Sequence, residues 1–158
     1  IILSQYGHMF APRPTVVVKE LARVLKPGGI LAFSTWPKEL FMGKFFSLIE
    51  SFSLPLPPEV ASPVLWGDMA VIEDRLKDHF DHIEFGRDVM FAPTMSPAHM
   101  LKLFEKNAGP LANLVKALAD DPTKLSNLRN AVLVLIEKYF SNNFLRQDFL
   151  MTRCVKKT

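Results

Sequence analysis

Apolar residues near the start of the chain form two unbroken runs separated by one stretch of helical spacing. Ile1–Ser4 is a short apolar run that ends in polar residues, which is typical of a buried parallel strand. Apolar residues then recur every three or four positions up to Leu25, and this spacing predicts a helix that begins near Pro14. Pro27-Gly28 predicts a type II turn, and Ile30–Phe33 predicts a second buried strand. Strand, helix, turn and strand in about 35 residues indicate a right-handed parallel crossover, so the predicted fold class is α/β.

The rest of the chain predicts more helices than strands, within one domain of residues 1–158. A phenylalanine-rich helix is expected at Leu40–Phe52, and the four prolines of Leu54–Pro63 predict a stiff surface segment. Asp68 is expected to cap a helix that ends near Asp78. The remaining expected elements are a helical insertion at residues 93–145, with helices after Ser96-Pro97, at Leu111–Leu118 and after Asp121-Pro122, and strands at His82–Phe85, Val89–Phe91 and Phe149–Val155, the first two separated at Gly86.

The composition narrows the class of protein. Of the 158 residues, 49% are hydrophobic and 22% are charged, which is enough apolar material for a core and excludes a disordered chain. The longest apolar runs, Ile30–Phe33 and Ala131–Ile136, are far shorter than the roughly 20 residues that a membrane-spanning helix needs. The formal charge of +3 comes from 19 basic and 16 acidic residues spread along the chain, so neither a nucleic-acid partner nor a membrane is expected.

The first residues and the cysteine content bear on completeness and location. The chain opens on Ile1-Ile2-Leu3-Ser4, without a methionine, a basic segment or a cleavable apolar segment. This opening reads as the middle of a strand, so we expect a truncated protein. The single cysteine, Cys154, cannot form an internal disulfide, so no oxidising compartment is required and a cytoplasmic location is expected.

Three segments together resemble a known enzyme family. They are Ser4-Gln5-Tyr6-Gly7-His8-Met9-Phe10, Glu20–Gly29 with the run Arg23-Val24-Leu25-Lys26-Pro27-Gly28-Gly29, and Ile30–Trp36. They resemble the second half of class I S-adenosylmethionine-dependent methyltransferases, in the branch that includes the ubiquinone and menaquinone methyltransferases. The resemblance implies that the chain supplies strands 4, 5, 7 and 6 of a Rossmann-like sheet of order 3-2-1-4-5-7-6, with the last strand of the sequence antiparallel.

The family's glycine-rich cofactor loop has no counterpart in this chain. No G-x-G sequence occurs, and the adjacent glycines Gly28-Gly29 stand at the turn into the family's fifth strand. The resemblance therefore implies a C-terminal half that lacks one wall of the S-adenosylmethionine pocket. We expect the isolated chain to bind this cofactor weakly and to be inactive. By family position, Ser4, Gln5 and Tyr6 would face the cofactor.

His8 lies just beyond the same strand end and is the candidate catalytic residue. Methyl transfer needs an aligned, desolvated nucleophile, and a base only where that nucleophile carries a proton. Histidine titrates near neutrality and could supply the base. The alternative is a histidine that only hydrogen-bonds the loop backbone, and we favour this alternative.

Aromatic residues beyond the second strand are candidates for an acceptor pocket. Trp36, Phe41 and Phe45 would line an apolar substrate pocket, although aromatic residues at helical spacing are more often ordinary core. His79 and His82 lie three residues apart, but no carboxylate motif of metal-site spacing accompanies them, so no metal site is predicted.

Two hypotheses of different classes remain open. In the first, the chain is the C-terminal portion of a methyltransferase for a small, apolar acceptor, which the proline-rich segment and the 93–145 insertion would cover. In the second, it is a non-catalytic α/β remnant that binds a partner or associates with itself. Because Ile1–Ser4 would lack its family neighbour on one side, it would present an open apolar edge. We therefore expect a homodimer through residues 1–10 and the adjoining faces of the 15–25 and 40–52 helices.

Overall fold

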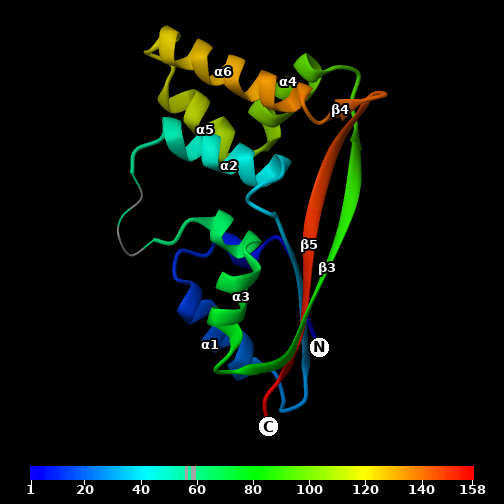
Figure 1. Ribbon diagram of the computed structural model, residues 1–158. Coiled ribbons are helices and arrows are strands. Elements are labelled where there is room, and N and C mark those ends of the chain that lie inside the picture. The colour runs from blue at the N-terminus through cyan, green and yellow to red at the C-terminus, as the bar shows by residue number, and fades with distance from the viewer. Residues whose placement is uncertain (56, 58–59) are drawn as a thin grey trace. The chain divides into compact units, whose positions relative to one another are not determined.

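The computed structural model describes residues 1–55, 57 and 60–158, and it divides the chain into two compact units (Figure 1). The first unit contains Ile1–Lys38, the described residues of Leu56–Asp88, and Asp148–Thr158. The second unit contains Glu39–Pro55 and Val89–Gln147. Part of the predicted surface segment, at residues 56, 58 and 59, lies outside the described residues.

The elements follow the expected order along the chain. The strands are β1 (Ile2–Gln5), β2 (Ile30–Thr35), β3 (Phe80–Pro93), β4 (Phe140–Ser141) and β5 (Phe144–Lys156). The α-helices are α1 (Pro14–Val24), α2 (Phe41–Phe52), α3 (Met69–Leu76), α4 (Pro97–Asn107), α5 (Gly109–Ala117) and α6 (Pro122–Glu137), and the short 3-10 helices are η1 (His8–Phe10) and η2 (Pro63–Gly67).

The strands form one mixed sheet in the order β1-β2-β5-β3, with β4 paired to β5. β1 is parallel to β2, and β5 runs antiparallel to β2. This order, with its antiparallel last strand, confirms the predicted α/β sheet. Within the described residues β1 pairs with β2 alone, so it is an edge strand. Gly28 adopts φ of 74° in the turn before β2, which confirms the predicted need for glycine there.

The core of the first unit lies on one face of β2. Leu31 and Phe33 on that face are buried, and α1 and α3 pack against each other beside the strands (Figure 1). The other face is open around Leu3 of β1, which is 77% exposed. Its register partner on β2 is Ala32, and the partner of Ala32 on β5 is the exposed Arg153. Side chains alternate between the faces of a strand, so Ser4 shares the buried face with Phe33.

The core of the second unit lies among four helices, where α2 and α4 each pack on α5 and α6 (Figure 1). Phe41 and Phe45 of α2 are fully buried. Phe41 stacks on Phe104 of α4, and Phe45 contacts the same ring at a tilt of 42°. The apolar stripe of α6 supplies Leu128, Val132 and Ile136 to the same core, as its helical spacing predicts.

Polar caps begin three of the helices, as the sequence predicts. The carboxylate of Asp68 accepts a hydrogen bond from the Ala70 amide at 3.1 Å, which fixes the start of α3. Ser96 and Asp121 cap α4 and α6 in the same way, and a proline follows each of them in the first turn.

The strands of the second half differ from the prediction. β3 runs without interruption through Gly86, so the predicted break there is wrong. Pairing in the sheet holds the glycine in the strand, because tertiary contacts override its low strand propensity. β5 begins at Phe144, five residues before the prediction, and forms a hairpin with β4 that was not predicted. Asn142 and Asn143 make its turn with φ of 50° and 61°, which asparagine tolerates well.

Candidate functional site

The candidate site lies where β1 and β2 end side by side in the first unit. Ser4 pairs with Phe33 in the sheet, and the chain leaves β1 through Tyr6, which adopts the left-handed φ of 58°. The amide of Tyr6 donates a hydrogen bond to the carbonyl of Ser34 at 3.1 Å, so the turn is tied to β2. The next residues form η1, which brings His8 back over the strand end. In α/β sheets, ligands bind at such carboxyl ends of parallel strands.

Ser4 and His8 interact through both the backbone and the side chains. The backbone amide of His8 donates to Oγ of Ser4 at 3.3 Å, and the same Oγ lies 3.0 Å from Nδ1 of His8. The imidazole also packs edge-on against Phe33, with ring centroids 4.5 Å apart. Burial, together with the positive charge of Arg75, lowers the pKa of His8 to about 4, so the ring is neutral at physiological pH.

Tyr6 and Trp36 form a parallel aromatic stack across the two strand ends. Their ring centroids are 3.8 Å apart and their planes differ by 5°. Trp36 is 5% exposed, and Tyr6 keeps more of its surface open. Burial raises the pKa of the Tyr6 hydroxyl, against the opposing effect of a hydrogen bond with Ser34. The phenol is therefore neutral and cannot serve as a base near neutral pH.

The turn before α3 is held tightly against the segment that follows β2. Gly67 lies so close to the carbonyl of Trp36 that no side chain fits between them. Nζ of Lys38 lies 2.7 Å from Oδ2 of Asp68, and this contact lowers the pKa of the aspartate. The two contacts fix η2, and with it Trp66, beside the ends of β1 and β2.

Trp66 and Arg75 belong to the site, and the sequence analysis did not single them out. Trp66 is 1% exposed and meets His8 edge to face, with ring centroids 4.6 Å apart. The guanidinium carbon of Arg75 lies 4.5 Å from the centre of a Trp66 ring, a cation–π contact. The sequence carried only a weak signal for them, since Trp66 stands beside a glycine and a helix-capping residue. No periodicity in the sequence predicts its contact with His8.

The structure brings together four of the seven residues predicted for the site. Ser4, Tyr6, His8 and Trp36 lie around the ends of β1 and β2. Gln5 alternates to the opposite face from Ser4 and is exposed. Phe41 and Phe45 belong to the buried core of the second unit. The roles of all seven in cofactor or substrate binding stay predictions.

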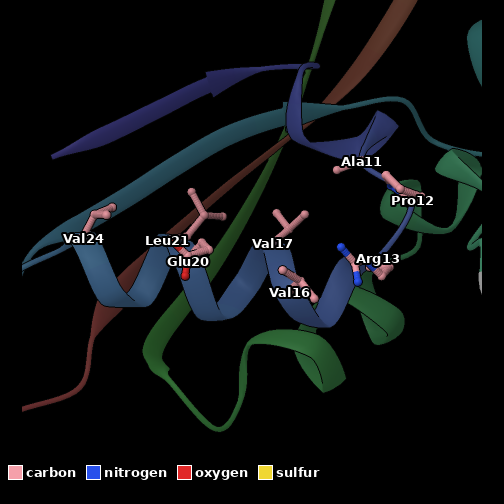
Figure 2. A pocket seen from close by; sticks show the side chains of 8 residues that line it. All are labelled: Ala11, Pro12, Arg13, Val16, Val17, Glu20, Leu21 and Val24. Atoms are coloured by element: carbon pink, nitrogen blue, oxygen red, sulfur yellow. The ribbon is translucent and has the colours of Figure 1, made fainter.

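An open apolar hollow of about 410 Å³ runs along α1 in the first unit (Figure 2). We call it the α1 hollow. Its lining comes from α1 and the turn before it: Ala11, Pro12, Arg13, Val16, Val17, Glu20, Leu21 and Val24. Val16 and Val24 are 43% and 56% exposed, so apolar side chains face solvent along this helix.

The described residues contain neither a metal-ligand cluster nor a membrane-spanning helix. No group of three histidine, cysteine, aspartate or glutamate side chains there is placed to hold a metal ion. None of the helices in that part of the chain combines the length and the apolar character needed to cross a bilayer.

Sequence comparison finds relatives without an assigned activity. No protein-family profile matches the chain. It is 28% identical over 151 residues to the uncharacterized protein Rv1403c of Mycobacterium tuberculosis (strain ATCC 25618 / H37Rv), a match that covers 95% of this chain and 55% of the relative. It is 24% identical over 157 residues to the uncharacterized protein Rv1405c of the same strain, which covers 99% of this chain and 57% of the relative. The chain thus spans little more than half the length of the curated relatives it matches.

Comparison of structures identifies the fold. The chain matches the crystal structure of a candidate methyltransferase (BH2331) from Bacillus halodurans C-125, with a TM-score of 0.50 and 12% sequence identity. The match covers 99% of this chain and 63% of the other. At this identity the likeness concerns the fold, so the chain has a methyltransferase-like α/β fold.

Proposed function

We propose that the chain is the C-terminal portion of an S-adenosylmethionine-dependent methyltransferase of the ubiquinone- and menaquinone-methyltransferase type that acts on a small, apolar acceptor in the cytoplasm. The observation that carries the proposal is the place of β5, which lies between β2 and β3 and runs antiparallel to β2. The order β1-β2-β5-β3 is the 4-5-7-6 order that the sequence resemblance implies. The fold shared with the Bacillus halodurans protein supports the same reading.

The cofactor would contact the ends of β1 and β2. By resemblance to the family, Ser4, Gln5 and Tyr6 would face the cofactor there, and the Tyr6–Trp36 stack would offer a flat aromatic surface. The chain lacks the glycine-rich loop whose backbone holds the cofactor in such folds. Contacts with one wall of the pocket cannot offset the entropy that a flexible cofactor loses on binding. We therefore propose that the isolated chain is inactive.

Calorimetric titration with S-adenosylhomocysteine tests the proposal. We expect weak or no binding to the 158-residue chain, and binding in the low micromolar range to the protein translated from the complete reading frame that encodes it. If the complete protein also fails to bind, the methyltransferase proposal is wrong. If the 158-residue chain binds tightly, the proposed inactivity of the isolated chain is wrong.

Variants of the complete protein test the assigned cofactor residues. Ser4→Ala and Tyr6→Ala should each weaken S-adenosylhomocysteine binding, because both side chains lie at the strand ends. Ser51→Ala is the matched control, since Ser51 is exposed on α2 and its hydroxyl donates to the Leu48 carbonyl. Equal affinities for all three variants and the unaltered protein would remove Ser4 and Tyr6 from the cofactor site.

A second proposal concerns the chain by itself. We propose that it forms a homodimer through residues 1–10 and the adjoining faces of the 15–25 and 40–52 helices. Ile1 and Leu3 are 84% and 77% exposed, and the α1 hollow adds further apolar surface. β1 offers unpaired backbone groups beside this surface, and a two-fold axis would let each copy cover the other.

A further inference from the structure

Five buried polar side-chain atoms of the described residues have no hydrogen-bond partner, and all five belong to the first unit. They are Nε2 of His8, Oγ1 of Thr35, Nε1 of Trp66, Nη1 of Arg75 and Oγ1 of Thr152. A buried polar atom without a partner costs about 1–3 kcal/mol. Native proteins therefore keep few of them, and each one calls for an explanation, such as an ordered water, an ion or a ligand.

Three of these atoms belong to side chains that touch one another. The imidazole of His8 meets the indole of Trp66 at 4.6 Å between ring centroids, with the planes 83° apart. The guanidinium of Arg75 lies over the same indole. We call these residues the His8–Trp66–Arg75 group. Trp66 is almost fully buried, whereas other atoms of His8 and Arg75 keep partial exposure. The three nitrogens themselves have almost no exposed surface, so a ligand reaches them only when the His8 or Arg75 side chain moves.

All three unpartnered nitrogens are hydrogen-bond donors. Indole and guanidinium nitrogens only donate. For His8, we assign the tautomer in which the Ser4 hydroxyl donates to Nδ1 across the 3.0 Å contact, while Oγ of Ser4 accepts from the His8 backbone amide. In a neutral ring whose Nδ1 accepts, the proton lies on Nε2. The group therefore presents three donors and needs an acceptor.

The charge of the group selects an anion. None of the ion pairs within the described residues involves Arg75, so its positive charge is not neutralised by an acidic side chain there. Phe33 flanks the group, edge-on to both His8 and Trp66. One cation, two neutral donors and aromatic walls suit a single carboxylate on an apolar body. An ammonium group next to the carboxylate would be repelled by Arg75.

We propose that the His8–Trp66–Arg75 group binds the carboxylate of a small apolar acid, such as an aromatic acid. Trp66 Nε1, Arg75 Nη1 and His8 Nε2 donate to its oxygens, and Phe33 contacts its apolar body. This inference rests on the proposed function only in naming that acid as the methyl acceptor. In that role the group holds the acceptor at the strand ends, and His8 acts as a hydrogen-bond donor to it.

Intrinsic fluorescence tests the binding on the 158-residue chain. The chain has two tryptophans, so Trp36→Phe leaves Trp66 as the only reporter. In this background, we expect benzoate to change the emission saturably and benzamide, its neutral analogue of the same shape, to leave it unchanged. Arg75→Gln should weaken benzoate binding by about tenfold or more, because a charge-assisted hydrogen bond is lost. Arg75→Lys keeps the charge but loses the fork and should weaken binding less.

A matched control separates a local effect from a general charge effect. Arg23→Gln removes an exposed arginine of α1 that pairs with Glu20, and benzoate affinity should not change. Far-UV circular dichroism of each variant checks that it is folded. Equal responses to benzoate and benzamide, or equal affinities in Arg75→Gln and Arg23→Gln, would overturn the proposal and leave ordered water as the partner of the three donors.

The source of the carboxylate is tested by competition. S-Adenosylhomocysteine carries a carboxylate next to an ammonium group, and we expect it not to displace benzoate. Displacement would overturn the assignment to an apolar acid and give the group to the cofactor. None of these measurements requires methyl transfer, so their failure is distinct from failure of the methyltransferase proposal, which the calorimetric titration decides.

Discussion

The backbone of Gly67 lies so close to the carbonyl oxygen of Trp36 that a Cβ atom on Gly67 would stand 1.9 Å from that oxygen. The same Cβ atom would stand 2.8 Å from the Cα atom of Pro37. Both neighbours are backbone atoms, so they cannot rotate away as a side chain would. The approach fixes Trp66 and Trp36 relative to each other, and both tryptophans belong to the candidate site.

Gly67→Ala should therefore destabilise the first unit. We expect the free energy of unfolding to fall by about 3 kcal/mol, since an added methyl group must displace backbone. Urea unfolding followed by tryptophan fluorescence measures this, because both tryptophans report on the first unit. Gly86→Ala is the matched control: a Cβ atom added there would meet nothing within 4 Å beyond its chain neighbours, and the stability should change by less than about 0.5 kcal/mol. Equal effects of the two variants would contradict the role of the close approach.

The strand ends of the site could be predicted from the sequence, whereas the contact of Trp66 with them could not. The apolar runs at the start of the chain placed Ser4, Tyr6 and His8 at one sheet edge, because strand length and polarity are local properties. Trp66 meets His8 only because η2 folds back across 58 positions of the chain, through the contact of Gly67 with Trp36. No local pattern encodes that approach.

Strand continuity was misjudged for a similar reason. Gly86 has low strand propensity, and β3 passes through it because its neighbour in the sheet, β5, is a long strand as well. The hairpin between β4 and β5 did carry a local signal in Asn142-Asn143, a pair suited to positive φ. The polar residues of this turn interrupt the apolar pattern, so the start of β5 after the turn was not predicted.

The low pKa of His8 predicts how stability depends on pH. The folded chain holds His8 at a pKa of about 4, against an ordinary value of 6.5. Between these values the unfolded chain binds a proton that the folded chain does not, so stability falls as the pH decreases through this window. The contribution is complete above about pH 6.5, is lost near pH 4, and is on the order of 2–3 kcal/mol.

Unfolding free energies at about pH 7 and about pH 5 measure this effect. His8→Gln should reduce the difference between them, because glutamine does not titrate. His82→Asn is the control, since His82 is exposed and asparagine tolerates its φ of 50°. The same pH dependence in both variants would show that His8 titrates normally.

Cys154 should be chemically inert in the folded chain. Its side chain has no exposed surface, and burial raises the pKa of its thiol to about 12 despite the opposing charge of Arg153. Only the thiolate is reactive, so almost none of it is available near neutral pH. We expect no reaction with a disulfide reagent such as Ellman's reagent in buffer and one thiol per chain in guanidinium chloride. Rapid labelling of the native chain would show that β5 opens locally.

The open edge at β1 predicts the assembly state of the 158-residue chain. β1 pairs with β2 alone within the described residues, and Leu3 stands on the uncovered face of the sheet at 77% exposure. An apolar edge without a lysine, a proline or a bulge favours pairing with another copy. Light scattering should therefore give a mass near twice the 17.9 kDa of one chain.

Leu3→Lys places a charge in the proposed interface and should move the mass toward one chain. Val134→Lys, at a 50% exposed apolar position of α6, should leave the dimer intact. If the unaltered chain stays monomeric at high concentration, or if both lysine variants dissociate alike, the edge of β1 does not form the interface and the proposed dimer is wrong.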